Sequence, residues 1–263
     1  MKMKLQSWCA VLLSAVALQA GATDLNNLRI GMDATYPPFE SLNPAGQIVG
    51  FEADLAAALC KEMKARCSLI NQDWDGIIPG LMAKKYDVIM SSMTITAERA
   101  KTVSFTERYF RTPQRLIAAK GSPLRFTVEG MKGKRVGVQR GTTADMYLSK
   151  FWGPRGMDVV RYEDQDKAYA DLVNGRLDAS FQDELQVEAG FLKSEPGKGF
   201  AFVGPSINGD NAAEREVLGS GAGMAVRKED KALLDKLNKA ISAVRANGTF
   251  KKLSVQYFGR DIY

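Results

Sequence analysis

Residues 88–105, VIMSSMTITAERAKTVSF, place hydroxyl side chains and one arginine directly after a short apolar run. A guanidinium offers a planar pair of donors that matches a carboxylate, and hydroxyl and backbone N–H groups complete such a shell. Helix capping is the alternative, because Thr96 would also suit the start of a short helix that leaves the arginine in solvent. The anion site predicted here is formed by Ser91, Ser92, Thr94 and Arg99.

Four further segments carry acidic, hydroxyl or aromatic side chains where a strand is expected to end. Each has an ordinary structural alternative, which is a turn aspartate, core packing of an aromatic ring, or a helix N-cap. The segments are MDATYPPF with Asp33 and Tyr36, QDWDG with Trp74, QRGTTAD with Thr142 and Thr143, and FQDE with Asp183.

Together these side chains describe one kind of ligand. Arg99 with its hydroxyl neighbours would hold a carboxylate, and Asp183 would hold an ammonium group. Tyr36 and Trp74 offer flat faces for an aliphatic chain or a guanidinium, and Asp33 remains for a second positive group. The sequence therefore predicts a site for an α-amino acid with a cationic side chain.

The elements that position these residues alternate between strand-like and helix-like patterns. This βαβ order implies mostly parallel sheets with helices on their faces. Ligands of such sheets bind beyond the carboxyl ends of the strands, where the polar segments lie. Strands are predicted at 28–34, 68–72, 86–92, 158–164 and 177–184, helices at 51–65, 76–85 and 165–176, and a strand, glycine turn and helix within 134–151. A C-terminal helix should bury the face formed by Leu233, Leu234, Leu237, Ile241 and Val244.

Composition limits the function. The 263 residues, 45% of them hydrophobic, suffice for two domains. The absence of histidine excludes Ser-His-Asp and Cys-His nucleophile systems and histidine-ligated zinc. The charges are interspersed without a basic tract, which disfavours nucleic acid as a partner. We expect a monomer without catalytic activity, metal or cofactor.

The N-terminus has the pattern of a cleavable signal peptide spanning residues 1–22. Lys2 and Lys4 precede the apolar run at 9–18, and Ala20–Ala22 forms a small-residue cleavage site. A transmembrane anchor is the alternative, although the apolar run is short for one. Cleavage after Ala22 would lower the formal charge from +6 to +4, because it removes two lysines and no acidic residue.

Export leaves two cysteines, Cys60 and Cys67, because Cys9 lies in the signal peptide. An even pair in an exported protein favours a disulfide, here between the end of a helix and the start of a strand.

At these residues the chain resembles the periplasmic binding proteins for lysine, arginine, ornithine and histidine that serve bacterial ABC importers. The matching stretches are IGMDATYPPFES, GFEADLAAALCKEM, DWDGIIPGL, DVIMSSMTITAER, FTERYF, RLIAAKGSP, GVQRGTT, GRLDASFQDE, GFLK and KKLSVQYFG. The resemblance implies a periplasmic protein with a two-lobed α/β fold (type II), a two-segment hinge, a basic amino acid as ligand and an inner-membrane permease as partner. The cysteine pair also matches the disulfide of this branch.

The resemblance assigns a role to each site residue. Arg99 would bind the α-carboxylate with Ser92, Thr94 and Thr143, and Asp183 would bind the α-ammonium group from the other lobe. Asp33 would meet the cationic end of the side chain with Ser91, and Tyr36 and Trp74 would enclose its aliphatic part. Gln139 and Thr142 complete the expected set. The first lobe would comprise 23–111 and 218–263, the second 115–207, and the hinge crossings 112–114 and 208–217.

Some positions depart from the family's usual pattern. Gln139–Arg140 stands where an apolar residue followed by glutamine is common, and Ala144 stands where glutamine is frequent. The sequence therefore leaves open which basic amino acid is preferred. Three other interpretations remain: a cyclohexadienyl dehydratase-like enzyme, a protein that binds an opine or another basic derivative, and a sensor for the same amino acid.

Overall fold

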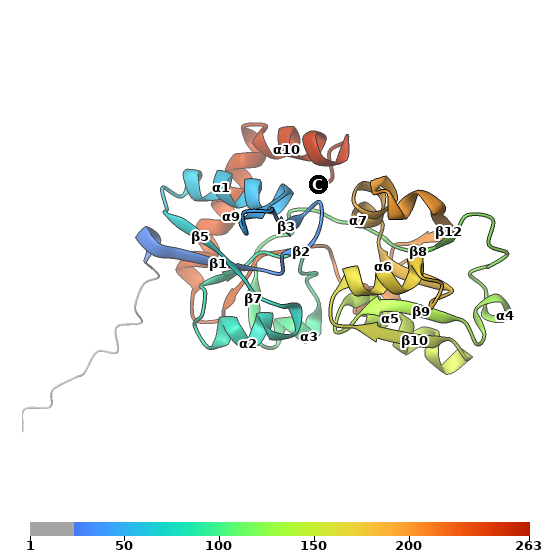
Figure 1. The fold of residues 1–263 in the computed structure, drawn as a ribbon. Helices are drawn as coiled ribbons and strands as arrows, with labels where there is room; N and C mark the ends of the chain where they lie inside the picture. Colours follow the sequence, from blue (N-terminus) through green and yellow to red (C-terminus); the bar gives the residue numbers. More distant parts are fainter. Residues whose placement is uncertain (1–23) are drawn as a thin grey trace, which may run out of the picture.

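The computed structural model describes residues 24–263, which form two lobes side by side (Figure 1). The predicted signal peptide, its cleavage site and Cys9 lie outside the described residues. Within 24–263, no helix has the length and apolar character needed to cross a membrane.

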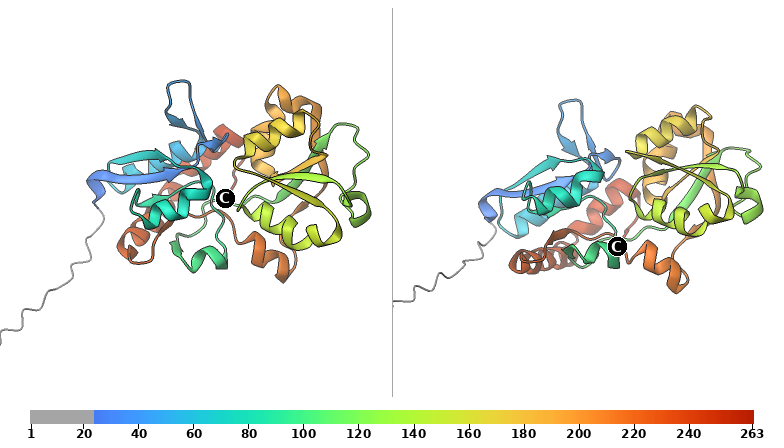
Figure 2. Two further views of the ribbon diagram at one scale, coloured as in Figure 1. Left: turned by 60° about the horizontal axis from the view of Figure 1, so that its bottom comes forward. Right: turned by 90° about the horizontal axis from the view of Figure 1, so that it is seen from below.

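The first lobe is a three-layer unit around a five-stranded sheet of order β5-β1-β6-β13-β7. Helices α1, α9 and α10 pack together on one face, and α2 and α3 lie against the other (Figures 1 and 2). The strands are β5 (Cys67–Asn71), β1 (Leu28–Met32), β6 (Val88–Ile89), β13 (Ala225–Arg227) and β7 (Val103–Phe105). The helices are α1 (Phe51–Glu62), α9 (Lys231–Ala246), α10 (Thr249–Phe258), α2 (Ile77–Met82) and α3 (Ala97–Ala100).

The core of the first lobe follows the predicted apolar patterns. Leu233, Leu237, Ile241 and Val244 are buried on the inner face of α9, and Leu234 packs partly buried against the same cluster. On the opposite face of the sheet, Ile77 and Leu81 of α2 enclose the ring of Tyr86. Both faces of the sheet are therefore covered, so only its ends and edges are available for a site.

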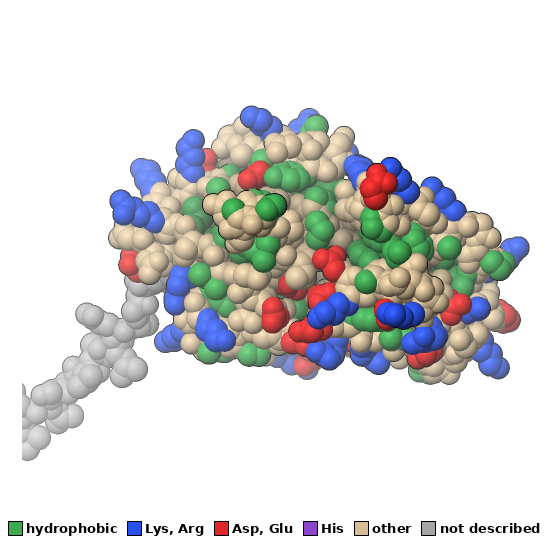
Figure 3. Space-filling model, viewed as in Figure 1, with side chains coloured by type: hydrophobic (Ala, Val, Ile, Leu, Met, Phe, Trp, Pro, Cys, Tyr) green, Lys and Arg blue, Asp and Glu red, His purple; other side chains and the backbone are tan. Residues whose placement is uncertain are grey.

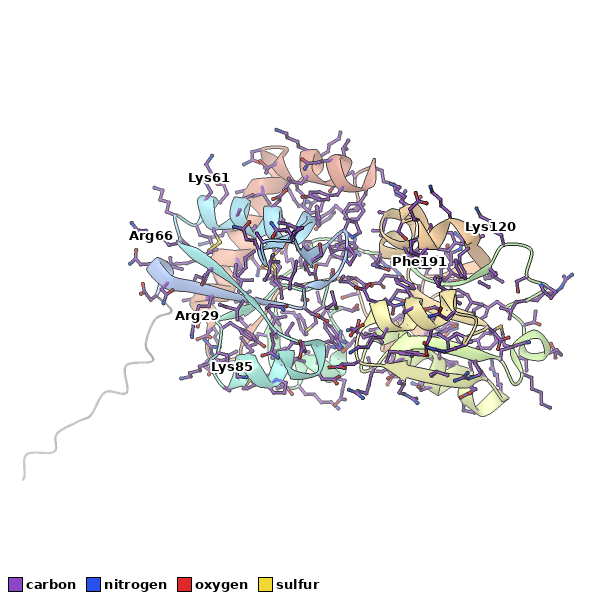
Figure 4. All side chains as sticks on the ribbon, viewed as in Figure 1. Arg29, Lys61, Arg66, Lys85, Lys120 and Phe191 are labelled. Carbon is purple, nitrogen blue, oxygen red and sulfur yellow. A yellow bond between two sulfur atoms is a disulfide. The ribbon has the colours of Figure 1, made fainter. Side chains whose placement is uncertain are left out.

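The second lobe repeats this layering around a sheet of order β10-β9-β11-β8-β12. One apolar cluster lies under α5, and a second lies under α6 and α7, where Phe191 stacks on Tyr169 at 4.1 Å between ring centroids (Figure 4). The strands are β10 (Asp158–Tyr162), β9 (Arg135–Gln139), β11 (Ala179–Asp183), β8 (Gln114–Ala119) and β12 (Phe200–Ile207). The helices are α4 (Val128–Met131), α5 (Thr143–Phe151), α6 (Gln165–Val173), α7 (Glu184–Ala189) and α8 (Ala212–Leu218).

Smaller elements complete the chain. The strands β2 (Thr35–Tyr36), β3 (Glu40–Leu42) and β4 (Ile48–Val49) form a small antiparallel sheet beside the first lobe. Short 3₁₀ helices span Leu25–Asn27, Trp74–Gly76, Gly153–Arg155, Phe191–Lys193 and Pro196–Gly199.

The two-lobed α/β fold predicted from the sequence is confirmed, and each large sheet is mixed because one of its strands runs antiparallel to both of its neighbours. β1 runs parallel to β5 and β6, whereas β13 is antiparallel to β6 and β7. Likewise β9 is parallel to β10 and β11, whereas β8 is antiparallel to β11 and β12. β8 and β13 enter their sheets from the other lobe, so no crossover helix fixes a parallel direction for them.

The chain passes between the lobes twice, from β7 to β8 and from α8 to β13. Residues 208–217, which we expected to be a hinge crossing, contain α8, and this helix packs on α5 of the second lobe. Val217 joins the core of that lobe, and Glu216 pairs with Lys150 at 3.1 Å. We therefore propose that the return crossing begins only after α8, at about 219–222.

The disulfide predicted between Cys60 and Cys67 is present and joins the end of α1 to the start of β5. The neighbouring side chains of Lys61 and Arg66 extend into solvent (Figure 4). The bond therefore closes a short surface loop at the edge of the sheet, away from the lobe interface.

Replacing both cysteines by serine should lower the free energy of unfolding without changing the site. The cysteines are 7 residues apart in sequence, and a loop of that size predicts a loss of about 2 kcal/mol through the greater entropy of the unfolded chain. Urea denaturation of Cys60→Ser/Cys67→Ser measures the loss. An unchanged transition midpoint would contradict a stabilising role for the bond.

Candidate functional site

A cavity of about 420 Å³ lies between the two lobes. Acidic side chains gather where the lobes meet (Figure 3). Every residue predicted for the site lines the cavity: Asp33, Tyr36, Trp74, Ser91, Ser92, Thr94, Arg99, Gln139, Thr142, Thr143 and Asp183. The ends of β1, β6, β9 and β11 bring these residues together, as expected for strand ends in α/β sheets.

Arg99 turns its guanidinium into the cavity from the short helix α3. Its Nη1 donates to the carbonyl of Thr94 at 2.9 Å, and its Nη2 donates to the carbonyl of Gly141 in the second lobe at 3.1 Å. Burial lowers the pKa of Arg99 to about 10, so the side chain stays cationic at neutral pH. Thr96 caps α3 by accepting from the backbone N–H of Arg99 at 3.2 Å. The capping interpretation is thus right for Thr96, while Arg99 faces the cavity rather than solvent.

Asp183 lines the same cavity as Arg99, but it belongs to the second lobe. It immediately precedes α7, yet its side chain makes no capping hydrogen bond. Its Oδ2 accepts from the hydroxyl of Tyr36 at 2.6 Å, and its Oδ1 accepts from the amide of Gln114. Burial raises the pKa of Asp183 to about 6, although these hydrogen bonds and the charge of Arg99 oppose the rise. The helix-cap alternative is therefore wrong for Asp183.

Asp33 is a second cavity carboxylate, and it is only 5% exposed. Its Oδ1 accepts from the hydroxyl of Thr35 at 2.9 Å, and its Oδ2 accepts from the amide of Gln139 at 3.1 Å. Burial raises its pKa, and the charges of Asp73 and Asp164 add to the rise. Among residues 24–263 no lysine or arginine pairs with Asp33, so a cation entering the cavity would complete its surroundings.

The two aromatic residues serve both the core and the cavity. Trp74 packs against the apolar cluster under α2, and its ring lies 5.1 Å from the guanidinium carbon of Arg99. Tyr36 stacks on Phe39 at 5.9 Å between ring centroids while its hydroxyl reaches Asp183. Core packing and a site role are therefore compatible for Trp74, because different faces of one side chain meet the two environments.

Ser91 and Ser92 differ in whether their hydroxyl groups form hydrogen bonds within the protein. Ser91 Oγ accepts from the backbone N–H of Asp33 and donates to Glu40, both at 2.9 Å. Ser92 has a φ of 50°, in the left-handed region, and its backbone N–H donates to both oxygens of Glu52. Its buried hydroxyl has no hydrogen-bond partner within residues 24–263, so Ser92 has a free polar group at the cavity wall.

The threonines at the start of α5 also differ. Thr142 caps the helix by accepting from the backbone N–H of Asp145 at 3.3 Å, and its hydroxyl donates to the carbonyl of Gln139 at 2.8 Å. The capping interpretation is right for Thr142. Thr143 is the first residue of α5 and is 5% exposed at the cavity wall. The N-terminal end of α5 therefore adds a positive dipole end beside Arg99.

The lobes contact each other around the cavity. Gln186 donates to the carbonyl of Pro37 at 3.0 Å, and Arg140 of the second lobe forms an ion pair with Asp75 of the first. At the C-terminus, Arg260 pairs with Glu188 of α7 at 2.6 Å. With Tyr36–Asp183 and Gln139–Asp33, these contacts hold the lobes in a closed arrangement.

Sequence reasoning missed several residues of the cavity wall. Gln114 lies at the first lobe crossing, and its contact with Asp183 has no local sequence signal. Ala144 entered the sequence analysis only as a departure from a family pattern. Glu40 follows a proline turn and was not distinguishable from an exposed acid. The missed wall residues are Glu40, Gln114, Ala144 and Gln182.

The charged side chains of the cavity can hold a small zwitterionic molecule. A guanidinium and a carboxylate on opposite walls match the two charges of an amino-acid zwitterion, and Asp33 offers a separate anionic contact. No group of three or more His, Cys, Asp or Glu side chains among residues 24–263 could hold a metal ion. The cavity therefore has the charges to orient a small ligand.

The chain is similar to known proteins over nearly its full length. Residues 28–260 match the bacterial extracellular solute-binding proteins, family 3. The histidine-binding periplasmic protein of Escherichia coli is 44% identical over 263 residues, covering 100% of this chain and 99% of that protein. The L-arginine-binding protein of Pseudomonas aeruginosa is 46% identical over 254 residues, covering 97% of this chain and 96% of that protein.

A solved structure shows the same likeness. An ancestral arginine-binding protein bound to arginine has a TM-score of 0.80 and 36% identity to this chain. The match covers 89% of this chain and 99% of that one.

Replacing Asp183 by asparagine should stabilise the ligand-free protein at neutral pH. The pKa of Asp183 is raised from 3.8 to about 6, so the folded state binds more protons than the unfolded state between these values. The free energy of unfolding therefore falls as pH rises through this interval, by about 3 kcal/mol in total. Asp183→Asn should recover that amount at neutral pH, and the gain should vanish as pH falls towards 3.8.

Urea denaturation of refolded, ligand-free protein measures this difference across pH. Asp235→Asn, at an exposed position of α9, serves as the matched control and should change little. A less stable Asp183→Asn variant at neutral pH would show that the carboxylate stabilises the fold instead.

Proposed function

The chain belongs to the bacterial extracellular solute-binding proteins of family 3, and we propose that it captures a basic L-amino acid for an ABC importer. The observation that carries the choice of ligand is Asp33, a buried carboxylate in the cavity whose partners among residues 24–263 are neutral donors. Relatives named for histidine and for arginine agree with this choice.

The α-carboxylate and α-ammonium groups of the ligand would lie between Arg99 and Asp183. Arg99 would form charge-assisted hydrogen bonds to the carboxylate, and the free hydroxyl of Ser92, with Thr94 and Thr143, would complete its shell. Asp183 would accept from the ammonium group. A carboxylic acid or an amine alone would leave one of the two charged side chains without a partner.

The side chain of the ligand would extend towards Asp33, flanked by Tyr36 and Trp74. The charges of the wall support this placement, because Arg99 contributes one positive charge and Asp33 and Asp183 two negative ones. Arginine, lysine or ornithine carries a net charge of about +1 at neutral pH, which balances these three side chains. Glutamine would leave Asp33 buried without a cation, and glutamate would add a third carboxylate.

Closure of the lobes would couple binding to transport. Arg99 and Asp183 belong to different lobes, so only a closed form lets one ligand contact both. A ligand that binds the closed form more tightly shifts the hinge equilibrium towards it. The closed surface would then be recognised by the membrane permease.

The location follows from the family and the N-terminal pattern. The Escherichia coli relative is a periplasmic protein, and we infer that this chain is exported to the periplasm. Cleavage after Ala22 would release a mature monomer that begins at Thr23. Mass spectrometry of the secreted protein would identify the cleavage site.

A thermal-shift series on refolded, ligand-free protein tests the proposed function. Arginine, lysine, ornithine and histidine should raise the melting temperature, because ligand at about 100 times its dissociation constant adds roughly 2.7 kcal/mol to stability. Glutamine and glutamate should have little effect. A response to glutamine or glutamate alone, or turnover of prephenate by the pure protein, would contradict the proposal.

Asp33→Asn should selectively weaken basic ligands. The amide removes the only cavity charge assigned to the side-chain cation, so arginine affinity should fall by about 2 kcal/mol, roughly thirtyfold. The discrimination between arginine and glutamine should shrink by a similar factor. Isothermal titration calorimetry measures both, with Asp235→Asn at an exposed position of α9 as control. Undiminished arginine binding by Asp33→Asn would place the cation elsewhere.

A further inference from the structure

Two carboxyl groups, Glu40 of β3 and Glu52 of α1, are buried beside the cavity, which Glu40 itself lines. Their side chains are 1% and 0% exposed. Two consecutive residues hold them side by side, because the hydroxyl of Ser91 donates to Glu40 and the backbone N–H of Ser92 donates to Glu52. No ion pair among residues 24–263 involves either of them. Two adjacent buried anions without a cation would be strongly unfavourable.

The hydrogen bonds of the pair are unequal. Glu52 accepts from the backbone N–H of Ser92 at 3.0 and 2.9 Å and from the hydroxyl of Tyr109. Glu40 accepts at Oε1 from Ser91, whereas its buried Oε2 has no donor among the described residues. Glu52 is therefore surrounded by donors, as a carboxylate requires, while Glu40 has a buried oxygen without a donor. A hydrogen on that oxygen would let Glu40 donate to the neighbouring carboxylate.

We propose that Glu40 and Glu52 share one proton at neutral pH, with Glu40 as the donor, and that this pair positions Asp33 and Ser92 for ligand binding. Burial raises the pKa of both groups, and for Glu40 the neighbouring charge of Glu52 raises it further. The other titratable groups that face the pair are Asp33, Tyr36 and Tyr109, and none of them is a cation.

Two short chains of hydrogen bonds connect the pair to residues that line the cavity. Glu40 accepts from the hydroxyl of Ser91, which itself accepts from the backbone N–H of Asp33. Glu52 holds the backbone N–H of Ser92, whose φ of 50° is unfavourable for a serine without such a constraint. Through these bonds the shared proton fixes the segment that carries Asp33 and the backbone that presents the free hydroxyl of Ser92.

The shared proton also sets a direction for the pH dependence of stability. The folded protein holds a proton on the pair at pH values where the same glutamates are ionised in the unfolded chain. Stability therefore falls as pH rises from about 5 through the raised pKa of the pair, because the unfolded state then binds fewer protons. Glu40→Gln keeps a donor to Glu52 without a titrating proton, so its stability should depend less on pH across this range.

Two ligand-free measurements test the shared proton. Wild-type protein at neutral pH should show an infrared C=O band of a protonated carboxyl that Glu40→Gln lacks. Its melting temperature should also fall more steeply than that of Glu40→Gln between about pH 5 and pH 9. Glu62→Gln, at an exposed position of the same helix as Glu52, should behave like wild type. An unchanged band, or an unchanged pH dependence in Glu40→Gln, would overturn the shared proton.

The positioning role rests on the proposed function and is tested by arginine affinity. Glu52→Gln should bind arginine roughly tenfold more weakly than wild type, because its amide would face the N–H of Ser92. Glu62→Gln, at an exposed position of the same helix, should bind as wild type does. Wild-type arginine affinity in Glu52→Gln would overturn the positioning role. The infrared and melting measurements involve no ligand, so they test the proton independently of the proposed ligand.

Discussion

The structure depends on how two carboxylates at the cavity are held by neutral hydrogen-bond donors from the opposite lobe. Asp183 of the second lobe accepts from Tyr36 of the first, and Asp33 of the first lobe accepts from Gln139 of the second. Each carboxylate thus takes a neutral donor from the opposite lobe. The hydrogen bonds that satisfy the carboxylates therefore also close the lobes, and a cationic ligand would add the charge that neutral donors lack.

Rigid sheets make this arrangement possible. Each lobe covers both faces of its sheet with helices, so the strand ends that carry Asp33, Ser92, Gln139 and Asp183 start from fixed positions. The segments beyond those ends accept unfavourable local features, including the left-handed backbone of Ser92 and the raised pKa of Asp183. Such features persist only where the surrounding core outweighs them.

The local sequence pattern predicts much of the fold and of the site. It does not reveal features that depend on contacts between residues far apart in the chain. The alternation of strands and helices, the disulfide and most of the cavity lining follow from period, residue type and strand ends, whereas Gln139 is implied only by the family resemblance. Tyr36 and Asp183, in contrast, are 147 residues apart, and no local pattern indicates that the one donates to the other. The mixed sheets and the packing of α8 also arise from the lobe crossings, where the chain direction is set by the partner lobe.

The capping residues show why residue type alone left the site ambiguous. Thr96 and Thr142 cap α3 and α5, as their types suggest. Asp183 precedes α7 in the same way, yet it leaves the helix without a side-chain cap because its carboxylate is held by Tyr36 and Gln114. A cap contributes about 1 kcal/mol, so α7 gives up that stabilisation while the cavity keeps its charge. A helix that lacks the cap its sequence offers is thus itself a sign that the residue is engaged elsewhere.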